Sequence, residues 1–148
     1  MKSVNFIIIL FFFMGSALMR CNDQGTAPYL TEYPVPDSNI SYYKDLQPLF
    51  NGKCGFGSQC HTAENPDNLL FFSTREIFIS HVIPGLSVPL VDPVKDALNP
   101  EQAPLYLIIT ESNYAGFERQ PPLSYNRAPL TEREIEGIRN WIKEGAPE

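Results

Sequence analysis

Two cysteines and a histidine are the residues whose types and spacing indicate chemistry. Cys54 and Cys60 are separated by five residues, and His61 follows the second cysteine directly. In covalent haem attachment, two thiols add to the vinyl groups of the porphyrin, and the histidine after the second thiol binds the iron, usually as C-x-x-C-H. The dipeptide Cys60-His61 keeps the part of this pattern that places the iron ligand. The segment therefore predicts a haem c held by Cys54 and Cys60, with His61 as the proximal ligand.

Two other interpretations of the same residues stay open. In an exported protein, two thiols six positions apart readily form a disulfide, and His61 would then be incidental. The other alternative is a zinc site formed by Cys54, Cys60, His61 and His81. Its spacing differs from the usual zinc patterns, and adjacent Cys-His ligands are rare in zinc sites. The five-residue spacer also exceeds the usual two, so the haem interpretation needs support from the rest of the chain.

The first twenty residues have the composition of an export signal. Lys2 gives a positive start, and residues 6–14 are nine consecutive apolar residues, whereas a membrane-spanning helix needs about twenty. We therefore predict a signal peptide over residues 1–20, with an uncleaved membrane anchor as the alternative. Cys21 then stands where the lipid-bearing first residue of a bacterial lipoprotein would be. Ordinary cleavage after Ala17 is the competing prediction.

Composition and charge limit the classes of function. The chain has 148 residues, 43% of them apolar, and a net charge of −6. The apolar fraction excludes full disorder, and the charge argues against nucleic acid as a partner, because binding phosphates requires a basic surface. We predict a single domain over residues 40–148, preceded by a polar, proline-rich tether over residues 21–39.

No pattern typical of an active site stands out in the domain. We expect Glu132, Glu134 and Glu136 to form the solvated first turn of a helix, where negative charge is favourable, rather than a catalytic set of carboxylates. The chain also has no acid pair, no Ser-His-Asp set and no phosphate loop of the kind that enzymes use. Export would place the protein in the periplasm or on the outer surface. Its contact with the membrane would then be only through an N-terminal lipid or an uncleaved signal.

Apolar spacing and prolines predict short helices joined by long loops, with no convincing strand. The first helix is expected over residues 40–52, with Pro48 either kinking it or starting a second turn. A later helix is expected to have Asn99 as its cap, Pro100 at its first position and its end near Thr110.

Two capping boxes predict where the remaining helices begin. Ser73 with Glu76 would start one helix, and Thr131 with Glu134 would start the last. The first of these helices would continue to the Pro-Gly pair at residues 84–85, so that His81 shares its apolar face. Each box is flanked by a pair of apolar residues at the positions of a hydrophobic staple: Phe72 with Ile77, and Leu130 with Ile135.

Three segments carry a resemblance to a known family. Residues 46–50 (LQPLF) precede Cys54, residues 99–106 read NPEQAPLY, and Gln120-Pro121-Pro122 is followed by LTEREIEGIRNWIKEGAP over residues 130–147. These segments are similar to the helix before the haem cysteines, the Ala-Pro-Leu-Tyr segment and the Met-Pro-Pro and C-terminal helix segments of small class I cytochrome c domains of exported bacterial proteins. The resemblance implies a mostly α, cytochrome c-like fold of short helices and long proline-rich loops around one haem. It also implies exchange of single electrons with a redox partner protein.

The sixth iron ligand is where the chain departs from this family. The family's methionine before Pro-Pro is Gln120 here, and the three methionines of the chain all lie in the expected export segment. The candidates are therefore His81, Gln120 or an open position that reacts with peroxide. The departures also keep a different function open, that of a haem-free cytochrome c-like lipoprotein with a Cys54–Cys60 disulfide, acting as a binding or structural module.

Overall fold

The computed structural model describes residues 32–55, 61, 70–123 and 128–148. Within these residues the chain forms four helices and one hairpin, which confirms the prediction of a mostly helical small domain. The elements are α2 (Gln47–Lys53), α3 (Arg75–Ser80), α4 (Pro104–Thr110), β1 (Asn113–Tyr114), β2 (Phe117–Glu118) and α5 (Glu132–Lys143). The predicted signal peptide, Cys21 and Cys60 lie outside the described residues.

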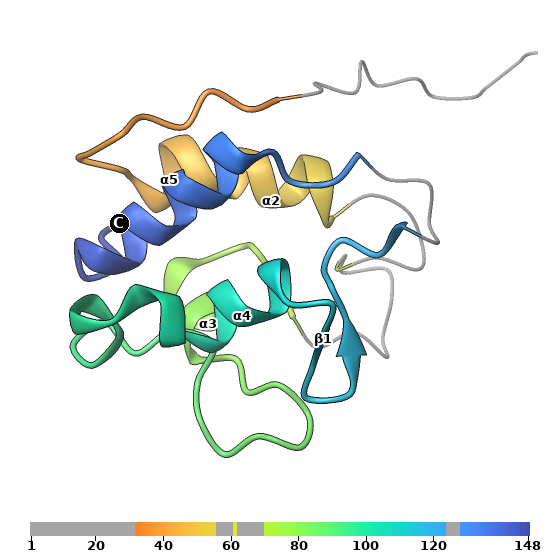
Figure 1. Ribbon diagram of the computed structural model, residues 1–148. Helices are drawn as coiled ribbons and strands as arrows, with labels where there is room; N and C mark the ends of the chain where they lie inside the picture. The colour runs from red at the N-terminus through yellow and green to blue at the C-terminus, as the bar shows by residue number, and fades with distance from the viewer. Residues whose placement is uncertain (1–31, 56–60, 62–69, 124–127) are drawn as a thin grey trace, which may run out of the picture.

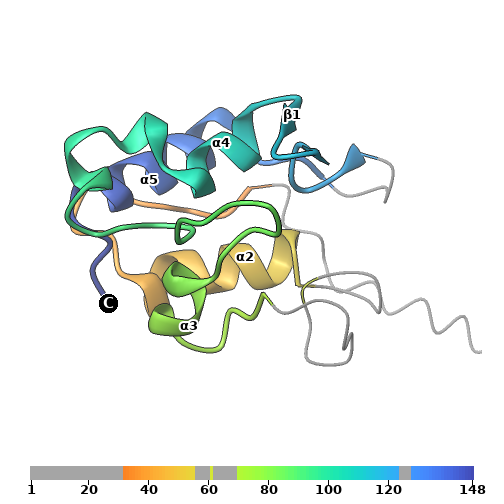
Figure 2. The same ribbon diagram turned by 90° about the horizontal axis from the view of Figure 1, so that it is seen from below.

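The four helices surround a common core. In Figure 1, α2 and α5 lie above α3 and α4, and the turned view in Figure 2 places α4 and α5 above α2 and α3. Each helix therefore lies beside two others. The largest fully buried side chains between them include Trp141, Tyr42 and Phe78. No helix in the described ranges combines the length and the apolar composition needed to cross a bilayer.

The first predicted helix is divided into two parts. Residues Tyr42–Leu46 form a π-helical turn, and α2 follows from Gln47. Ser41 caps the π-helical turn, because its side chain accepts a hydrogen bond from the Lys44 amide at 3.3 Å. Pro48 lies in the first turn of α2, where a missing N–H breaks no helical hydrogen bond. Of the two expected effects of Pro48, the start of a second turn is therefore the one observed.

The start of α3 differs from the prediction. The cap is Thr74, whose side chain accepts from the Ile77 amide at 3.3 Å, and the expected capping box of Ser73 with Glu76 is not formed. The reason is a long-range contact. The Gln47 side-chain amide donates to the Ser73 carbonyl at 3.1 Å, which holds Ser73 outside the helix. Ile77 is 46% exposed, so the expected staple does not bury this side chain either.

The start of α4 is also later than predicted. Pro100–Gln102 form a 3-10 turn, Asn99 makes no side-chain capping bond, and α4 begins at Pro104 after an extended Ala103. Its end at Thr110 agrees with the prediction. Leu105 and Ile109 are buried, whereas Ile108 is only partly buried.

A short hairpin follows α4, where no strand was expected. Asn113 pairs with Glu118 and Tyr114 with Phe117 in antiparallel register. The two residues between the strands, Ala115 and Gly116, both have positive φ, of 53° and 85°. Two consecutive residues in this conformation make the type I′ turn that suits the twist of a two-residue hairpin loop. Strands of two residues are too short to show an alternating pattern in the sequence.

The start of α5 confirms its predicted capping box. The Thr131 hydroxyl accepts from the Glu134 amide at 3.2 Å, and the Glu134 carboxylate accepts from the Thr131 amide at 2.8 Å. Ile138, Trp141 and Ile142 lie on the inner face of α5 and are fully buried.

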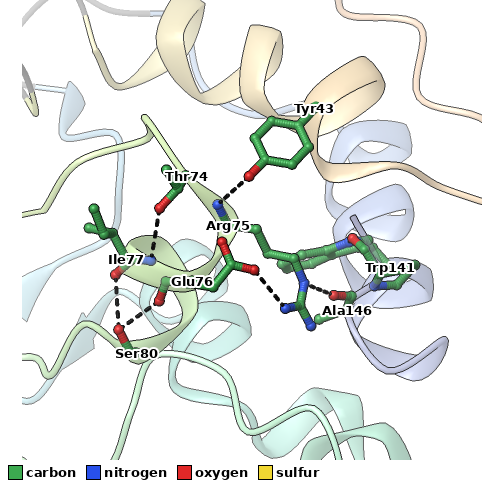
Figure 3. A network of polar contacts seen from close by, with 9 residues as sticks. Tyr43, Thr74, Arg75, Glu76, Ile77, Ser80, Trp141 and Ala146 are labelled. Atoms are coloured by element: carbon green, nitrogen blue, oxygen red, sulfur yellow. Dashed lines mark hydrogen bonds and ion pairs between the residues drawn. The ribbon is translucent and has the colours of Figure 1, made fainter.

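Polar contacts attach α3 to its neighbours (Figure 3). The Tyr43 hydroxyl accepts a hydrogen bond from the Arg75 amide at 3.4 Å, and the Arg75 guanidinium donates to the Ala146 carbonyl. The Trp141 indole in turn donates to the Pro147 carbonyl at 2.8 Å. The last residues of the chain thus connect the beginning of α3 to the end of α5.

Residues 32–40, here called the N-terminal strap, lie along α2 and α5 (Figure 1). Val35 and Ile40 are each 1% exposed, and the Glu144 carboxylate accepts from the amides of Asn39 and Ile40 at 2.8 and 3.0 Å. The described part of the expected tether is therefore packed into the domain. The polar composition of residues 21–39 concealed this, because a strap held mainly through its backbone needs few apolar side chains.

Two glycines allow the strap to lie so close to the helices. A Cβ at Gly137 would overlap Val35, and a Cβ at Gly52 would overlap the ring of Tyr33. Both positions are helical or helix-terminal, where a glycine is otherwise unfavourable by about 1 kcal/mol relative to alanine. Close packing of the strap thus explains both residues.

We predict that Gly137→Ala lowers the free energy of unfolding by about 1–3 kcal/mol, because the overlap with Val35 outweighs the better helix propensity of alanine. The same substitution in a Val35→Ala background should be neutral or stabilising, since the overlapping methyl groups are gone. Urea unfolding of the four variants in this cycle measures both effects. A stabilising effect of Gly137→Ala in the unaltered background would contradict the packing.

Candidate functional site

The end of α2 brings two of the three motif residues together. The Cys54 amide donates to the Phe50 carbonyl at 2.8 Å, which continues the helical turn to the cysteine. The Cys54 carbonyl accepts from the His61 amide at 3.0 Å, so the chain returns to the end of α2 after the segment that contains Cys60. Cys54 and His61 are both partly buried. Cys60 itself lies outside the described residues.

The imidazole of His61 lies at the margin of an aromatic cluster. Its ring meets the ring of Phe72 edge to face, with centroids 5.8 Å apart and planes at 71°. Phe72 stacks on Phe50 at 5.5 Å and contacts Phe78 at 5.7 Å. The aromatic cluster consists of Tyr42, Phe50, Phe72, Phe78 and Trp141. One side of the His61 ring is therefore covered by an apolar side chain.

Phe72 is held in place through its backbone. Its carbonyl accepts from the Tyr42 hydroxyl at 3.1 Å and from the Gln47 side-chain amide at 2.7 Å. Burial raises the pKa of Tyr42 far above its usual value, so the phenol stays protonated and remains a donor. The first turns of the domain thereby fix the ring against which His61 packs.

A buried ion pair lies directly beside Cys54. Lys53 is 3% exposed and Glu134 is fully buried, with the Lys53 Nζ atom 3.3 Å from Glu134 Oε2. Nζ also donates to the Pro129 carbonyl at 3.0 Å. The expectation that Glu134 belongs to a solvated acidic face is therefore wrong. Glu134 faces the core because Lys53 and backbone amides satisfy its charge there.

The Glu134 carboxylate binds three segments of the chain. Besides Lys53, Oε1 accepts from the Tyr33 amide of the strap at 2.7 Å, and Oε2 accepts from the Thr131 amide at 2.8 Å. The sequence contains one signal of this arrangement. Gly137 stands one turn after Glu134 on the same face of α5, and a glycine within a helix indicates close approach by another segment.

His81 does not lie on a helix, contrary to the prediction. Because α3 ends at Ser80, His81 follows the helix with extended backbone, and its carbonyl accepts from the Leu90 amide at 2.7 Å. The side chain is half-buried, and burial lowers the pKa of His81 below its usual 6.5. No hydrogen bond joins its ring to any of the described residues, and its role as the sixth iron ligand stays a prediction.

Gln120 is held by local contacts. Its amide donates to the Ile108 carbonyl at 2.8 Å, and its side-chain Nε2 donates to the Glu118 carbonyl at 3.1 Å. The structure therefore joins the backbones of Cys54 and His61, whereas the role of Gln120 as the sixth ligand stays a prediction. Across that same part, no group of three or more His, Cys, Asp or Glu side chains is arranged to hold a metal ion.

The residues that are present fit a covalently held haem in their donor chemistry. The backbones of Cys54 and His61, which carry a thiol and the imidazole of the predicted motif, are linked through one hydrogen bond, and an apolar ring contacts the imidazole. Such partly dry surroundings are what a haem site provides for its iron ligand. Figures 1 and 2 show the end of α2 and the hairpin at the same end of the molecule.

No protein-family model, no curated protein and no solved structure matches this chain. The function is therefore argued from the residues and their geometry.

We predict that Lys53→Met lowers the free energy of unfolding by about 3–5 kcal/mol, because it leaves the buried Glu134 charge without its cation. Chemical denaturation measures this loss. Lys44→Met is the matched control, since Lys44 is an exposed lysine close to the same helix, and it should change stability by less than about 0.5 kcal/mol. Equal effects of the two substitutions would show that the ion pair is not formed.

The lowered pKa of His81 predicts a dependence of stability on pH. Between the lowered folded-state pKa and the usual 6.5, the unfolded chain binds the proton more strongly, so stability falls as the pH is reduced through this window. His81→Gln should remove this part of the fall. Unfolding of both proteins at pH 8 and pH 5 checks the prediction, and identical falls would contradict it.

Proposed function

We propose that the protein is an exported c-type cytochrome that carries single electrons through one covalently bound haem. The observation that carries the proposal is the hydrogen bond from the His61 amide to the Cys54 carbonyl, with the imidazole beside Phe72. A plain disulfide does not require an imidazole next to it in the sequence, whereas a haem iron needs one as its ligand. We also propose that the four-helix domain has a cytochrome c-like fold.

Cys54 and Cys60 would hold the group and His61 would bind its iron. Each thiol would be joined to the group by one thioether bond, formed by addition of its S–H across a vinyl group, so that no oxidant would be consumed. The bound haem supplies reversible one-electron chemistry at iron. The part of the chain is to fix the imidazole through the end of α2, and to exclude water on the side covered by Phe72.

His81 and Gln120 remain the candidates for the sixth ligand. The lowered pKa of His81 keeps its imidazole neutral near pH 7, as a metal ligand must be. The Gln120 side chain uses its nitrogen on Glu118, which leaves its oxygen as the atom for ligation. An open position that reacts with peroxide is the third possibility. Visible spectra of His81→Ala and Gln120→Ala decide, because the variant that loses the ligand changes from a low-spin to a high-spin spectrum.

The cellular setting is proposed from the sequence alone. Export through residues 1–20 and lipid attachment at Cys21 would place the domain at a membrane surface, in the periplasm or outside the cell. The electron donor and acceptor would be proteins that the domain meets there. Cys21→Ala is a control for the haem experiment. Loss of a lipid anchor should release the protein from the membrane, whereas loss of a residue that holds the haem should change the spectrum.

We predict that the full chain, expressed with a cytochrome c maturation system, gives a c-type pyridine haemochrome spectrum. Cys54→Ala and Cys60→Ala should each lose one thioether bond, which shifts the α band toward longer wavelength, and His61→Ala should prevent stable incorporation. Cys21→Ala should release the protein from the membrane without altering the spectrum. A colourless protein whose mass shows no haem adduct would exclude the proposed function.

The haem-free alternative also has a structural observation in its favour. Ring centroids in the aromatic cluster lie 4.7 to 6.4 Å apart, so the chain's own side chains close the core beneath His61. In this alternative, a Cys54–Cys60 disulfide closes the loop and the domain is a binding or structural module of a lipoprotein. Mass spectrometry without reduction would then show the loss of two hydrogens instead of added haem.

A further inference from the structure

We infer that the Lys53–Glu134 ion pair positions the site, by holding the Cys54 thiol and the His61 imidazole against the beginning of α5. Lys53 is therefore assigned as a positioning residue. The role in haem binding rests on the proposed function, whereas the placement of the Cys54 segment does not.

Lys53 holds Cys54 in place. Lys53 is the last residue of α2, and its Nζ atom is held from two directions, by Glu134 Oε2 at 3.3 Å and by the Pro129 carbonyl at 3.0 Å. Cys54 follows directly and keeps a helical hydrogen bond to Phe50. Movement of Cys54 away from α5 would therefore require Lys53 to leave both partners.

The position of Cys54 in turn constrains His61. The described link between the two motif residues is the bond from the His61 amide to the Cys54 carbonyl at 3.0 Å. His61 also contacts the ring of Phe72, whose carbonyl accepts from Tyr42 and from Gln47 at the start of α2. Cys54 and Phe72 thus each contact His61, and the positions of both depend on where the segment from Tyr42 to Lys53 lies.

The buried Lys53–Glu134 pair is better explained by positioning than by a gain in stability. An ion pair taken out of water loses its hydration, so apolar residues of similar size are often as stabilising or more so. A carboxylate that accepts from Lys53, Tyr33 and Thr131 instead defines directions for three segments at once. Such a group is better suited to fixing geometry than to adding stability.

The test measures the accessibility of Cys54 in the full chain, produced without haem attachment and kept reduced. Iodoacetamide is the probe, and mass mapping separates Cys54 from the other two cysteines. Lys53→Met should increase the Cys54 alkylation rate several-fold, and Lys53→Arg, which keeps the charge, should restore most of the protection.

Ile142→Ala is the control for general loss of stability, because it removes fully buried apolar volume from α5 without touching the pair. A merely structural role of Lys53 predicts equal alkylation rates in Lys53→Met and Ile142→Ala, and that result would overturn the inference. If Lys53→Met does not fold, Lys53→Gln replaces it, because an amide can still donate to the Pro129 carbonyl. Unchanged protection in Lys53→Gln would likewise overturn the inference.

A second arm uses the mature, haem-bearing protein. Lys53→Met should shift the midpoint potential and the visible spectrum relative to Ile142→Ala, and Lys53→Arg should reverse most of the shift. If no version of the chain binds haem, the proposed function fails, and the alkylation rates still decide whether Lys53 positions Cys54. If haem binds but the potential and the spectrum match those of Ile142→Ala, the positioning role in haem binding fails alone.

Discussion

The described part of the domain depends on one pair of opposite charges held out of water. Lys53 is the last residue of α2, Glu134 lies in the first turn of α5, and the amides of Tyr33 and Thr131 also donate to the Glu134 carboxylate. Lys53 and Glu134 each need the other, because an unpaired charge in the interior is far more costly in free energy than an unpaired charge at the surface. The pair therefore joins the strap, the first helix and the last helix into one unit. The aromatic cluster then fills the space between the four helices.

Local sequence rules succeed here where the interaction is itself local. Thr131 caps α5 as expected, and Pro48 takes a first-turn position, because both effects depend only on neighbouring residues. The same rules fail at Ser73, which has a suitable pattern but whose carbonyl is bound by Gln47 from another helix. The strap is missed for a similar reason. Val35 is buried only because Gly137, far along the chain, leaves room for it.

The residues of the candidate site also fall into those that the sequence predicts and those that only tertiary contacts reveal. The proximity of Cys54 and His61 follows from a motif that the sequence displays, and the structure links the two through one hydrogen bond. The ring of Phe72 and the buried Lys53–Glu134 pair could not be derived, since neither has a fixed spacing from the motif. His81 was misplaced because the helix expected to continue to Pro84 ends at Ser80, one residue before His81. The residues proposed to hold a cofactor form a motif that is visible in the sequence. The residues that hold them in place are identified only from tertiary contacts.

The path of the N-terminal strap has a mechanical consequence. The strap is attached near both ends of α5, through Glu134 to Tyr33 at its beginning and through Glu144 to Asn39 and Ile40 at its end. A pulling force applied on the N-terminal side of residue 32 would reach the bond from the Tyr33 amide to Glu134 before it loads any helix. Tension on the chain would thus be felt first at the carboxylate that pairs with Lys53, one residue before Cys54.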